Sequence, residues 1–240
     1  MGCCLSTYDE FDYYKRKSEL KTGDLVLFSG KGGMSCLIKT GTFSPWSHVG
    51  IIIRTRTDFE GFTSSDNLYL FHAYKEHLGP DVFSGENKSG VQLNRLGDAL
   101  RRYIRSGGVP CIRKGPPYLS IERGSLPSVS IDPFENEDTK EWFRKKTELE
   151  YEESLYQLVS SQIDCCCLPC FQNYGDETSY FCSELTRRTL AYLYPYEYGL
   201  EEGEYPDEQT PNDQSTNVYC FWAEKKIDLE EWESEERVVF

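Results

Sequence analysis

The sequence has no long apolar run: no segment approaches the roughly 20 consecutive apolar residues that a membrane-spanning helix requires. A secretory signal is not visible either, because residues 5–20 are polar and charged. Basic side chains are few, with 26 Lys and Arg against 40 Asp and Glu, and the net charge is −14. Nucleic-acid binding depends on clustered Lys and Arg. We therefore expect a globular cytoplasmic protein with no nucleic-acid partner.

Most of the negative charge lies towards the C-terminal end of the sequence. Residues 197–240 carry 14 acidic and 3 basic side chains. We interpret this acidic C-terminal segment as a solvated face rather than as a dedicated cation site.

Histidine is scarce in this sequence, with three residues, whereas there are ten cysteines. The cysteines are clustered, at Cys3-Cys4 and within residues 165–170, where three are consecutive. Adjacent cysteines are poor partners for one another in disulfides, so the pattern favours a reducing compartment. The cluster Cys165-Cys166-Cys167-Cys170 has three interpretations: a zinc site, an acylated loop, or an apolar packed loop. Three consecutive thiolates cannot all reach one ion without contorting the backbone, which disfavours zinc.

The N-terminal sequence MGCCLS matches a lipidation signal. Gly2 follows the initiator Met, and Ser6 stands where N-myristoylation requires Ser or Thr. Cys3 and Cys4 are adjacent to that glycine and are candidates for thioester acylation. One myristoyl chain binds a membrane only marginally, whereas two lipids hold a protein there stably. We expect residues 1–20 to form a lipidated anchor segment that holds the protein on a membrane surface.

Short apolar runs rich in β-branched and aromatic residues predict a small sheet. Residues 7–20 are expected to be helical or irregular, and residues 115–137, rich in Pro, Ser and Gly, to form an insertion. The other expected elements are strands at 23–30, 47–55, 68–74 and 109–114, an extended segment that becomes a helix over 90–103, a helix over 138–162, and a terminal strand around 218–227. The pattern predicts the α+β class, with a small, mostly antiparallel sheet packed with helices. We expect a single domain over residues 21–240.

Cys182 stands near the start of an amphipathic segment, residues 179–193. In a helix, Leu185, Thr189 and Leu193 would share a face with Cys182, so this cysteine would point inward at the helix N-terminus. There the helix dipole and the free backbone N–H groups would stabilise a thiolate and lower its pKa. The alternative is an inert buried cysteine, which is a common fate of this residue.

A cysteine nucleophile needs a base, and His48 and His72 are the candidates. If the strands 47–55 and 68–74 pair antiparallel, the start of the first lies beside the end of the second, so the two histidines would meet. His48 would then deprotonate the thiol and His72 would orient the His48 ring. His77 lies beyond the strand and is expected on the surface. A metal site made of Cys182, His48 and His72 is a further alternative, but we expect no metal.

Five segments carry a resemblance to a known family. They are GDLVLF, SHVGIII, GVQLNRLGDALRRY, VPCIRK and FCSELTRRTL. Together they resemble the circularly permuted papain-like amidases of the NlpC/P60 superfamily, which include bacterial YaeF/YiiX-like proteins and poxviral relatives. The histidine precedes the cysteine, which is the reverse of the order in papain. The resemblance covers roughly residues 20–222.

This resemblance implies a permuted papain-like fold and a thiol hydrolase that cleaves amide or ester bonds through a thioester, with no cofactor. The family's nucleophile matches Cys182, its base matches His48, its third polar residue matches His72, and a tyrosine of its substrate pocket matches Tyr151. Many members are expected to have a carboxylate at the third position, whereas acyltransferases related to lecithin–retinol acyltransferase use histidine. A histidine there favours lipid-like substrates.

Three functions remain open on the sequence alone. The first is a membrane-tethered cysteine hydrolase acting on a small-molecule, lipid or peptide substrate. The second is a non-enzymatic membrane-tethered binding module on the same fold. The third is an acyltransferase, which differs from the hydrolase only in the acceptor that resolves the thioester.

Overall fold

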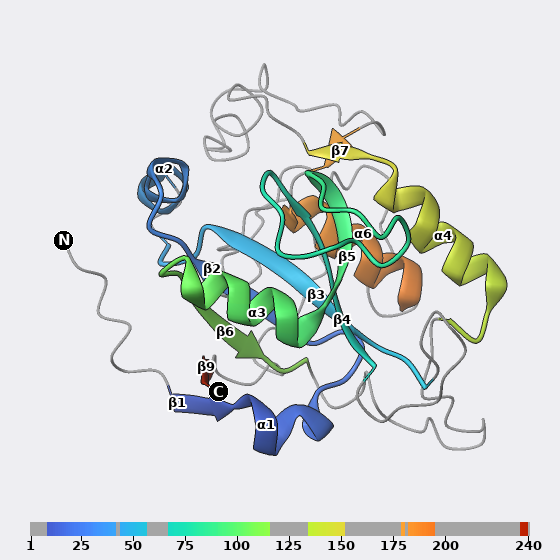
Figure 1. Ribbon diagram of the computed structural model, residues 1–240, viewed down its shortest axis with the longest axis horizontal. Coiled ribbons are helices and arrows are strands. Elements are labelled where there is room, and N and C mark those ends of the chain that lie inside the picture. Colours follow the sequence, from blue (N-terminus) through green and yellow to red (C-terminus); the bar gives the residue numbers. More distant parts are fainter. Residues whose placement is uncertain are drawn as a thin grey trace, which may run out of the picture.

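The computed structural model describes residues 9–41, 44–56, 67–115, 134–151, 179–180, 182–194 and 236–239. In chain order the elements are β1 (Asp9–Asp12), α1 (Tyr13–Arg16), the 3-10 helix η2 (Lys17–Glu19), β2 (Leu25–Ser29), α2 (Gly33–Gly41), β3 (His48–Arg54), β4 (Leu68–Tyr74), β5 (Gly90–Arg95), α3 (Leu96–Arg105), β6 (Val109–Arg113), α4 (Glu137–Thr147), β7 (Glu150–Tyr151), β8 (Ser179–Tyr180), α6 (Cys182–Leu193) and β9 (Glu236–Val239) (Figure 1).

The main sheet has the strand order β1-β9-β6-β2-β3-β4-β5. Strands β2, β3, β4 and β5 form an antiparallel meander, and β6 adds to it antiparallel to β2. β9 extends the sheet antiparallel to β6. β1 is parallel to β9. A separate pair, β7 and β8, is also parallel. The expected α+β class and its antiparallel sheet packed against helices are confirmed.

Both faces of the sheet are covered, which is why its central strands are apolar along their whole length rather than at every second position. α6 and α4 cover one face and α3 covers the other, as Figure 1 shows with α3 in front of the strands and α6 behind them. The α6 face includes Leu25, Leu27, Val49, Ile51, Ile53, Tyr69, Phe71, Val91, Leu93, Phe143, Leu185 and Leu190. The α3 face includes Val26, Phe28, Ile52, Leu68, Leu70, Leu96, Ala99, Leu100, Tyr103 and Ile112. Consecutive residues of one strand alternate between these two cores.

Three sequence-based expectations need correction or lie outside the described residues. Residues 9–12 form strand β1, so the expected anchor segment contains a strand of the main sheet. The helix expected over 138–162 ends at Thr147, and β7 follows it. Asn136 caps that helix, because its side chain accepts hydrogen bonds from the first backbone N–H groups, so the end of the 115–137 insertion is the start of α4. The strand expected around 218–227 lies outside the described residues.

Within the described ranges, no helix combines the length and the apolar character needed to cross a membrane. The candidate lipidation sites Gly2, Cys3 and Cys4 lie outside those ranges, as does the cysteine cluster at 165–170.

Candidate active site

The β3–β4 pair brings His48 and His72 together, as the sequence predicts. His48 opens β3, and His72 lies near the end of β4, which runs antiparallel to it. The Nε2 atom of His48 lies 2.9 Å from Nδ1 of His72, and both side chains are buried. The two imidazoles therefore share a hydrogen bond inside the protein rather than at its surface.

Gly50 makes this approach possible. The β3–β4 register, continued from Ile51 and Phe71, places Gly50 opposite His72. A Cβ atom built on Gly50 would lie 3.0 Å from Cβ of His72 and 2.7 Å from Cδ1 of Leu70. The space that a side chain at position 50 would take is thus filled by the residues of β4.

Asn94, on β5, extends the pair into a three-residue chain. Its Oδ1 atom lies 2.7 Å from Nε2 of His72. Its Nδ2 atom donates to the carbonyl oxygens of Gly79 and Pro80, at 3.1 and 3.0 Å. Asn94 is fully buried, and every polar atom of its side chain is paired. The buried polar network His48–His72–Asn94 is therefore well satisfied, which makes it a rigid feature of the fold.

Aromatic rings enclose the His48 imidazole. It packs against Phe28 of β2 and Tyr74 of β4, with ring centroids 5.0 and 4.7 Å away. Phe28 in turn contacts Tyr103 of α3. His48 therefore belongs to the core on the α3 face of the sheet.

Burial keeps both imidazoles neutral. Loss of hydration lowers the pKa of His48 well below its usual value of 6.5, and the neighbouring His72 lowers it further. Burial also lowers the pKa of His72, to about 4, although the hydrogen bond to Asn94 opposes this change. At neutral pH the pair therefore consists of two uncharged rings.

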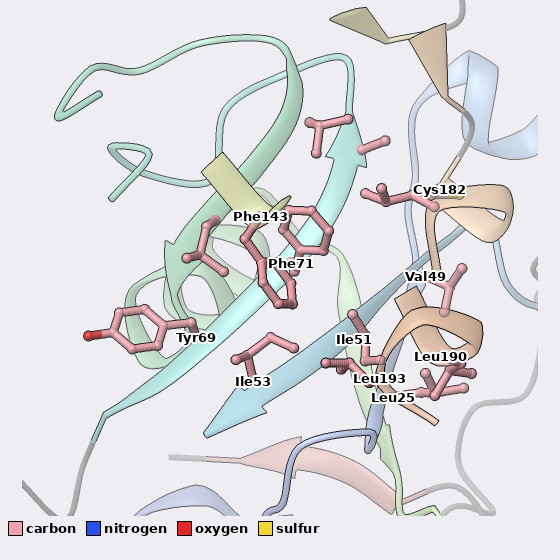
Figure 2. Close-up of a cluster of buried hydrophobic side chains, with 14 of the residues drawn as sticks. Leu25, Val49, Ile51, Ile53, Tyr69, Phe71, Phe143, Cys182, Leu190 and Leu193 are labelled. Atoms are coloured by element: carbon pink, nitrogen blue, oxygen red, sulfur yellow. The ribbon is translucent and has the colours of Figure 1, made fainter. Parts of the chain in front are cut away.

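Cys182 is the first residue of α6, as expected from the sequence, and its side chain is buried in the α6-face core together with Val49 (Figure 2). His48, next to Val49 along β3, points to the opposite face. Both residues lie at the end of the sheet where β3 begins. The described structure contains no hydrogen bond between the Cys182 thiol and the His48 imidazole.

The expectation of a lowered thiol pKa at this helix N-terminus is not supported. Burial raises the pKa of Cys182 to about 11, and this effect outweighs hydrogen bonds from the backbone N–H groups of Val49, Ser183 and Cys182 itself, which lower it. The sequence shows the helix start but not the depth of burial, which depends on how α6 packs against the sheet. The resting thiol is therefore protonated.

Tyr151 lies on strand β7 rather than in the helix expected over 138–162, whereas His77 is exposed, as expected. Tyr151 is half-buried and packs against the core that contains Cys182. It lies on β7, which pairs with β8, and β8 ends two residues before Cys182. This position next to the start of α6 fits a pocket-lining role. His77 is exposed and takes no part in the site.

Among the described residues, no group of three or more His, Cys, Asp or Glu side chains is arranged to hold a metal ion. The metal alternative of Cys182, His48 and His72 thus has no support in the geometry.

Sequence reasoning missed Asn94. Within VQLNR, apolar residues alternate with polar ones, which is the usual pattern of a strand with one solvated face. Gln92 and Asn94 are instead fully buried. Their side-chain amides donate hydrogen bonds to the backbone carbonyls of Glu76 and Gly79, in the segment that follows β4. The signal was present as two amides between apolar residues, but the sequence does not show that the segment after β4 covers them.

Comparison with solved structures finds similarity to the metalloprotein YiiX (DUF1105) from Escherichia coli O157:H7. The TM-score is 0.38 and the sequence identity is 15%, over 73% of this chain and 67% of the YiiX chain. The sequence matches no protein-family model and no curated protein. YiiX is therefore a distant structural neighbour, and its description as a metalloprotein concerns that protein.

Proposed function

We propose that the protein is a thiol-dependent acyl hydrolase in which Cys182 is the nucleophile, His48 the general base and His72 the residue that orients His48. One observation carries this proposal: two buried, uncharged imidazoles share a hydrogen bond at the end of the sheet where α6 presents Cys182. Histidines whose pKa values are strongly perturbed by burial are candidates for a functional site.

The reaction would begin with proton transfer from the Cys182 thiol to His48 as the sulfur attacks the carbonyl carbon of an ester or amide. His48 would then protonate the leaving alcohol or amine, and a thioester on Cys182 would remain. Water, activated by His48, would hydrolyse this thioester and regenerate the thiol. Backbone N–H groups of Cys182 and Val49 point to the sulfur and could stabilise the oxyanion.

The resting geometry determines how the first step must proceed. Because the thiol is protonated and the imidazole neutral, no preformed thiolate–imidazolium pair is available. Because Cys182 and His48 point to opposite faces of the sheet, the start of β3 must rearrange for the sulfur and the imidazole to come within hydrogen-bond distance when substrate binds. Substrate binding between the start of α6 and the start of β3 would bring them together.

The fold assignment and the setting are part of the same proposal. The order of the histidine strand before the cysteine helix supports a circularly permuted papain-like (NlpC/P60) domain. Acylation of Gly2 with Cys3 or Cys4 would place this domain on the cytoplasmic surface of a membrane, where lipids or lipidated peptides are the available substrates. An acyltransferase reaction would use the same thioester with another acceptor.

The test is direct detection of the acyl-enzyme. Purified protein is incubated with p-nitrophenyl esters of short and long chain length, and the modified peptide is identified by mass spectrometry. Acylation is expected at Cys182, and it should disappear in Cys182→Ser and fall strongly in His48→Gln. Cys111→Ser and His77→Gln are matched controls, because Cys111 is another buried free thiol and His77 an exposed histidine. Acylation spread equally over Cys36, Cys111 and Cys182 would refute the proposal.

A non-enzymatic binding module is the second candidate. The raised pKa of Cys182 and its position across the sheet from His48 favour it. This candidate predicts no acylation of Cys182 by any ester and unchanged partner binding in Cys182→Ser.

A further inference from the structure

We propose that Asn94 is a positioning residue which, through His72, determines which nitrogen of His48 is basic. This inference rests on the proposed function only for the use of that nitrogen in catalysis. The network itself is a property of the fold.

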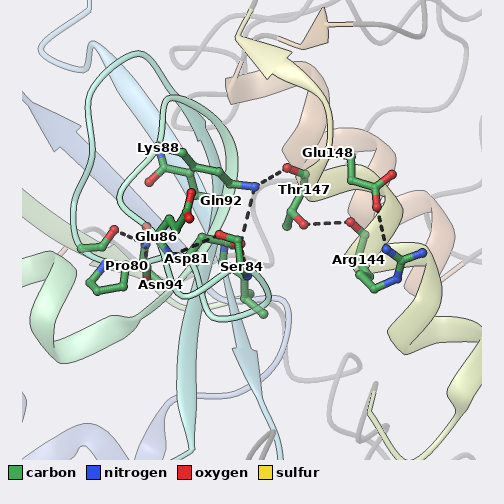
Figure 3. Close-up of polar contacts among 12 residues, drawn as sticks. Pro80, Asp81, Ser84, Glu86, Lys88, Gln92, Asn94, Arg144, Thr147 and Glu148 are labelled. Carbon is green, nitrogen blue, oxygen red and sulfur yellow. Dashed lines mark hydrogen bonds and ion pairs between the residues drawn. The ribbon is translucent and has the colours of Figure 1, made fainter.

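The orientation of the Asn94 amide is fixed by its surroundings (Figure 3). The carbonyl oxygens of Gly79 and Pro80 can only accept hydrogen bonds, so the group that faces them must be the NH₂. Oδ1 therefore faces His72, and a carbonyl oxygen can only accept. It follows that Nε2 of His72 carries the hydrogen.

The tautomer of His72 in turn determines that of His48. A neutral imidazole carries one N–H, so Nδ1 of His72 has a lone pair and accepts. Its partner at 2.9 Å is Nε2 of His48, which must then donate. The ring nitrogen of His48 that remains free to accept a proton is Nδ1. The amide of Asn94, the penultimate residue of β5, thus fixes the basic nitrogen of a residue two strands away.

The loop with Gly79 and Pro80, which bonds the Asn94 amide, is itself held in place by hydrogen bonds. Asp81, directly after Pro80, is buried, and its carboxylate accepts from the backbone N–H groups of Leu93 and Ser84 at 2.9 and 3.0 Å. Leu93 precedes Asn94 on β5. The carbonyls that orient Asn94 are therefore tied to the strand that carries it, and the amide cannot turn over without breaking three or more hydrogen bonds.

This arrangement suits a base that must gain and lose a proton. When Nδ1 of His48 takes a proton, its Nε2–H continues to donate to His72, and His72 continues to donate to Asn94. No ring has to turn and no other proton has to move. The opposite set of tautomers would leave the lone pair of His48 directed at His72, where no substrate proton can reach it.

The first measurement is made on the unmodified full chain. ¹⁵N-labelled histidine and long-range ¹H–¹⁵N correlation spectra distinguish the two neutral tautomers of each ring, with signals assigned from His48→Gln and His72→Gln. We expect both buried histidines in the Nε2–H form. An Nδ1–H form at either ring would overturn the inference whatever the activity.

The second measurement uses Asn94→Leu, which removes the acceptor at similar volume, and Gln92→Leu as the control. Gln92 is another fully buried amide on β5, but it bonds to the backbone of Tyr74 and Glu76 rather than to a histidine ring. In Asn94→Leu we expect Nδ1–H signals to appear at His72 and His48, whereas Gln92→Leu should keep the unmodified tautomers. Equal spectra for the two variants would refute the role of Asn94.

Reactivity separates this inference from the proposed function. The rate of Cys182 acylation by a p-nitrophenyl ester at pH 7 should fall about tenfold or more in Asn94→Leu, since removing a general base costs about 10² to 10⁴ in rate. The rate at high pH, where hydroxide generates the thiolate, should not change. Altered tautomers with an unaltered rate at pH 7 would confirm the positioning and refute His48 as the base.

Discussion

His48 and His72 are 24 residues apart in sequence, and their rings are joined by a 2.9 Å hydrogen bond in the interior. Neither ring is charged at neutral pH, because burial lowers the pKa of both. The pair therefore combines a cost in stability with a capacity to accept protons.

The reactivity of Cys182 should differ from that of an activated catalytic thiolate. Its raised pKa, about 11, predicts that alkylation by iodoacetamide at pH 7 is slower than at the exposed Cys36, and that the rate keeps rising towards pH 10. His48→Gln should leave the alkylation rate unchanged at both pH 7 and pH 10, because the thiol and the imidazole are not in contact in the resting protein. Peptide mass spectrometry resolves the sites. A plateau below pH 8.5 would mean that the helix N-terminus outweighs burial.

His72 should make the fold sensitive to acid. Its pKa is lowered from 6.5 to about 4 in the folded state, so the unfolded chain binds a proton more readily between these values. The stability that neutral His72 contributes is present above pH 6.5 and is lost as the pH falls through about 4, by roughly 3 kcal/mol.

The comparison of unmodified protein with His72→Gln isolates this effect. Asp24 acts in the opposite direction, because burial raises its pKa to about 6, but it is common to both proteins. The difference in their free energies of unfolding, from urea titrations, should change in favour of the variant between pH 6.5 and 4.5. The exposed His77→Gln should show no such trend. A difference independent of pH would show that His72 is not buried neutral.

Gly50→Ala should destabilise the protein and disturb the histidine pair. The added Cβ would lie 2.7 Å from the Leu70 side chain and 3.0 Å from that of His72, so β4 must shift. Overpacking of this kind costs about 1–3 kcal/mol. Gly33→Ala is the control, because a Cβ there meets nothing within 4 Å. Equal free energies of unfolding of the two variants in urea would show that β3 and β4 can accommodate a methyl group at position 50.

Lys88→Met should loosen the contact between the Asp81 loop and α4. The Lys88 ammonium lies 3.5 Å from the buried Asp81 carboxylate and donates to the carbonyl of Thr147 at the end of α4 (Figure 3). Removing it leaves that carboxylate without its cation, and we expect a loss of about 1–3 kcal/mol. Lys145→Met, which removes an exposed ion pair with Glu141, should stay within about 0.5 kcal/mol.

If the Lys88 contact acts as described, Asp81→Asn should reduce the effect of Lys88→Met in a double-mutant cycle. Purely additive losses would indicate that the lysine stabilises α4 alone.

Strand positions and the histidine pairing could be predicted from the sequence because both follow from short-range patterns. Apolar runs such as LVLF and IIIR mark strands buried on both faces, and antiparallel pairing of consecutive strands brings the start of one to the end of the next. The position of Cys182 at a helix start follows from local amphipathicity in the same way.

Two properties of the site could not be predicted, because they depend on which element covers which face. Period-two alternation shows that His48 and Val49 point to opposite sides, but not that α6 lies on the Val49 side. The raised pKa of Cys182 has the same origin, since burial by distant residues opposes the local effect of the helix start. The burial of Asn94 could not be predicted, because alternation of apolar and polar residues normally indicates a strand with one solvated face.

The pairing of β1 with β9 has a consequence for the order in which the protein is made. Residues 9–12 are synthesised long before their partners in the sheet, residues 236–239, and among the described strands β9 is the one that connects β1 to β6. During synthesis β1 therefore cannot pair with β9 until residues 236–239 have left the ribosome. The attachment of residues 9–12 to the sheet is therefore a late event, which follows the synthesis of residues 236–239.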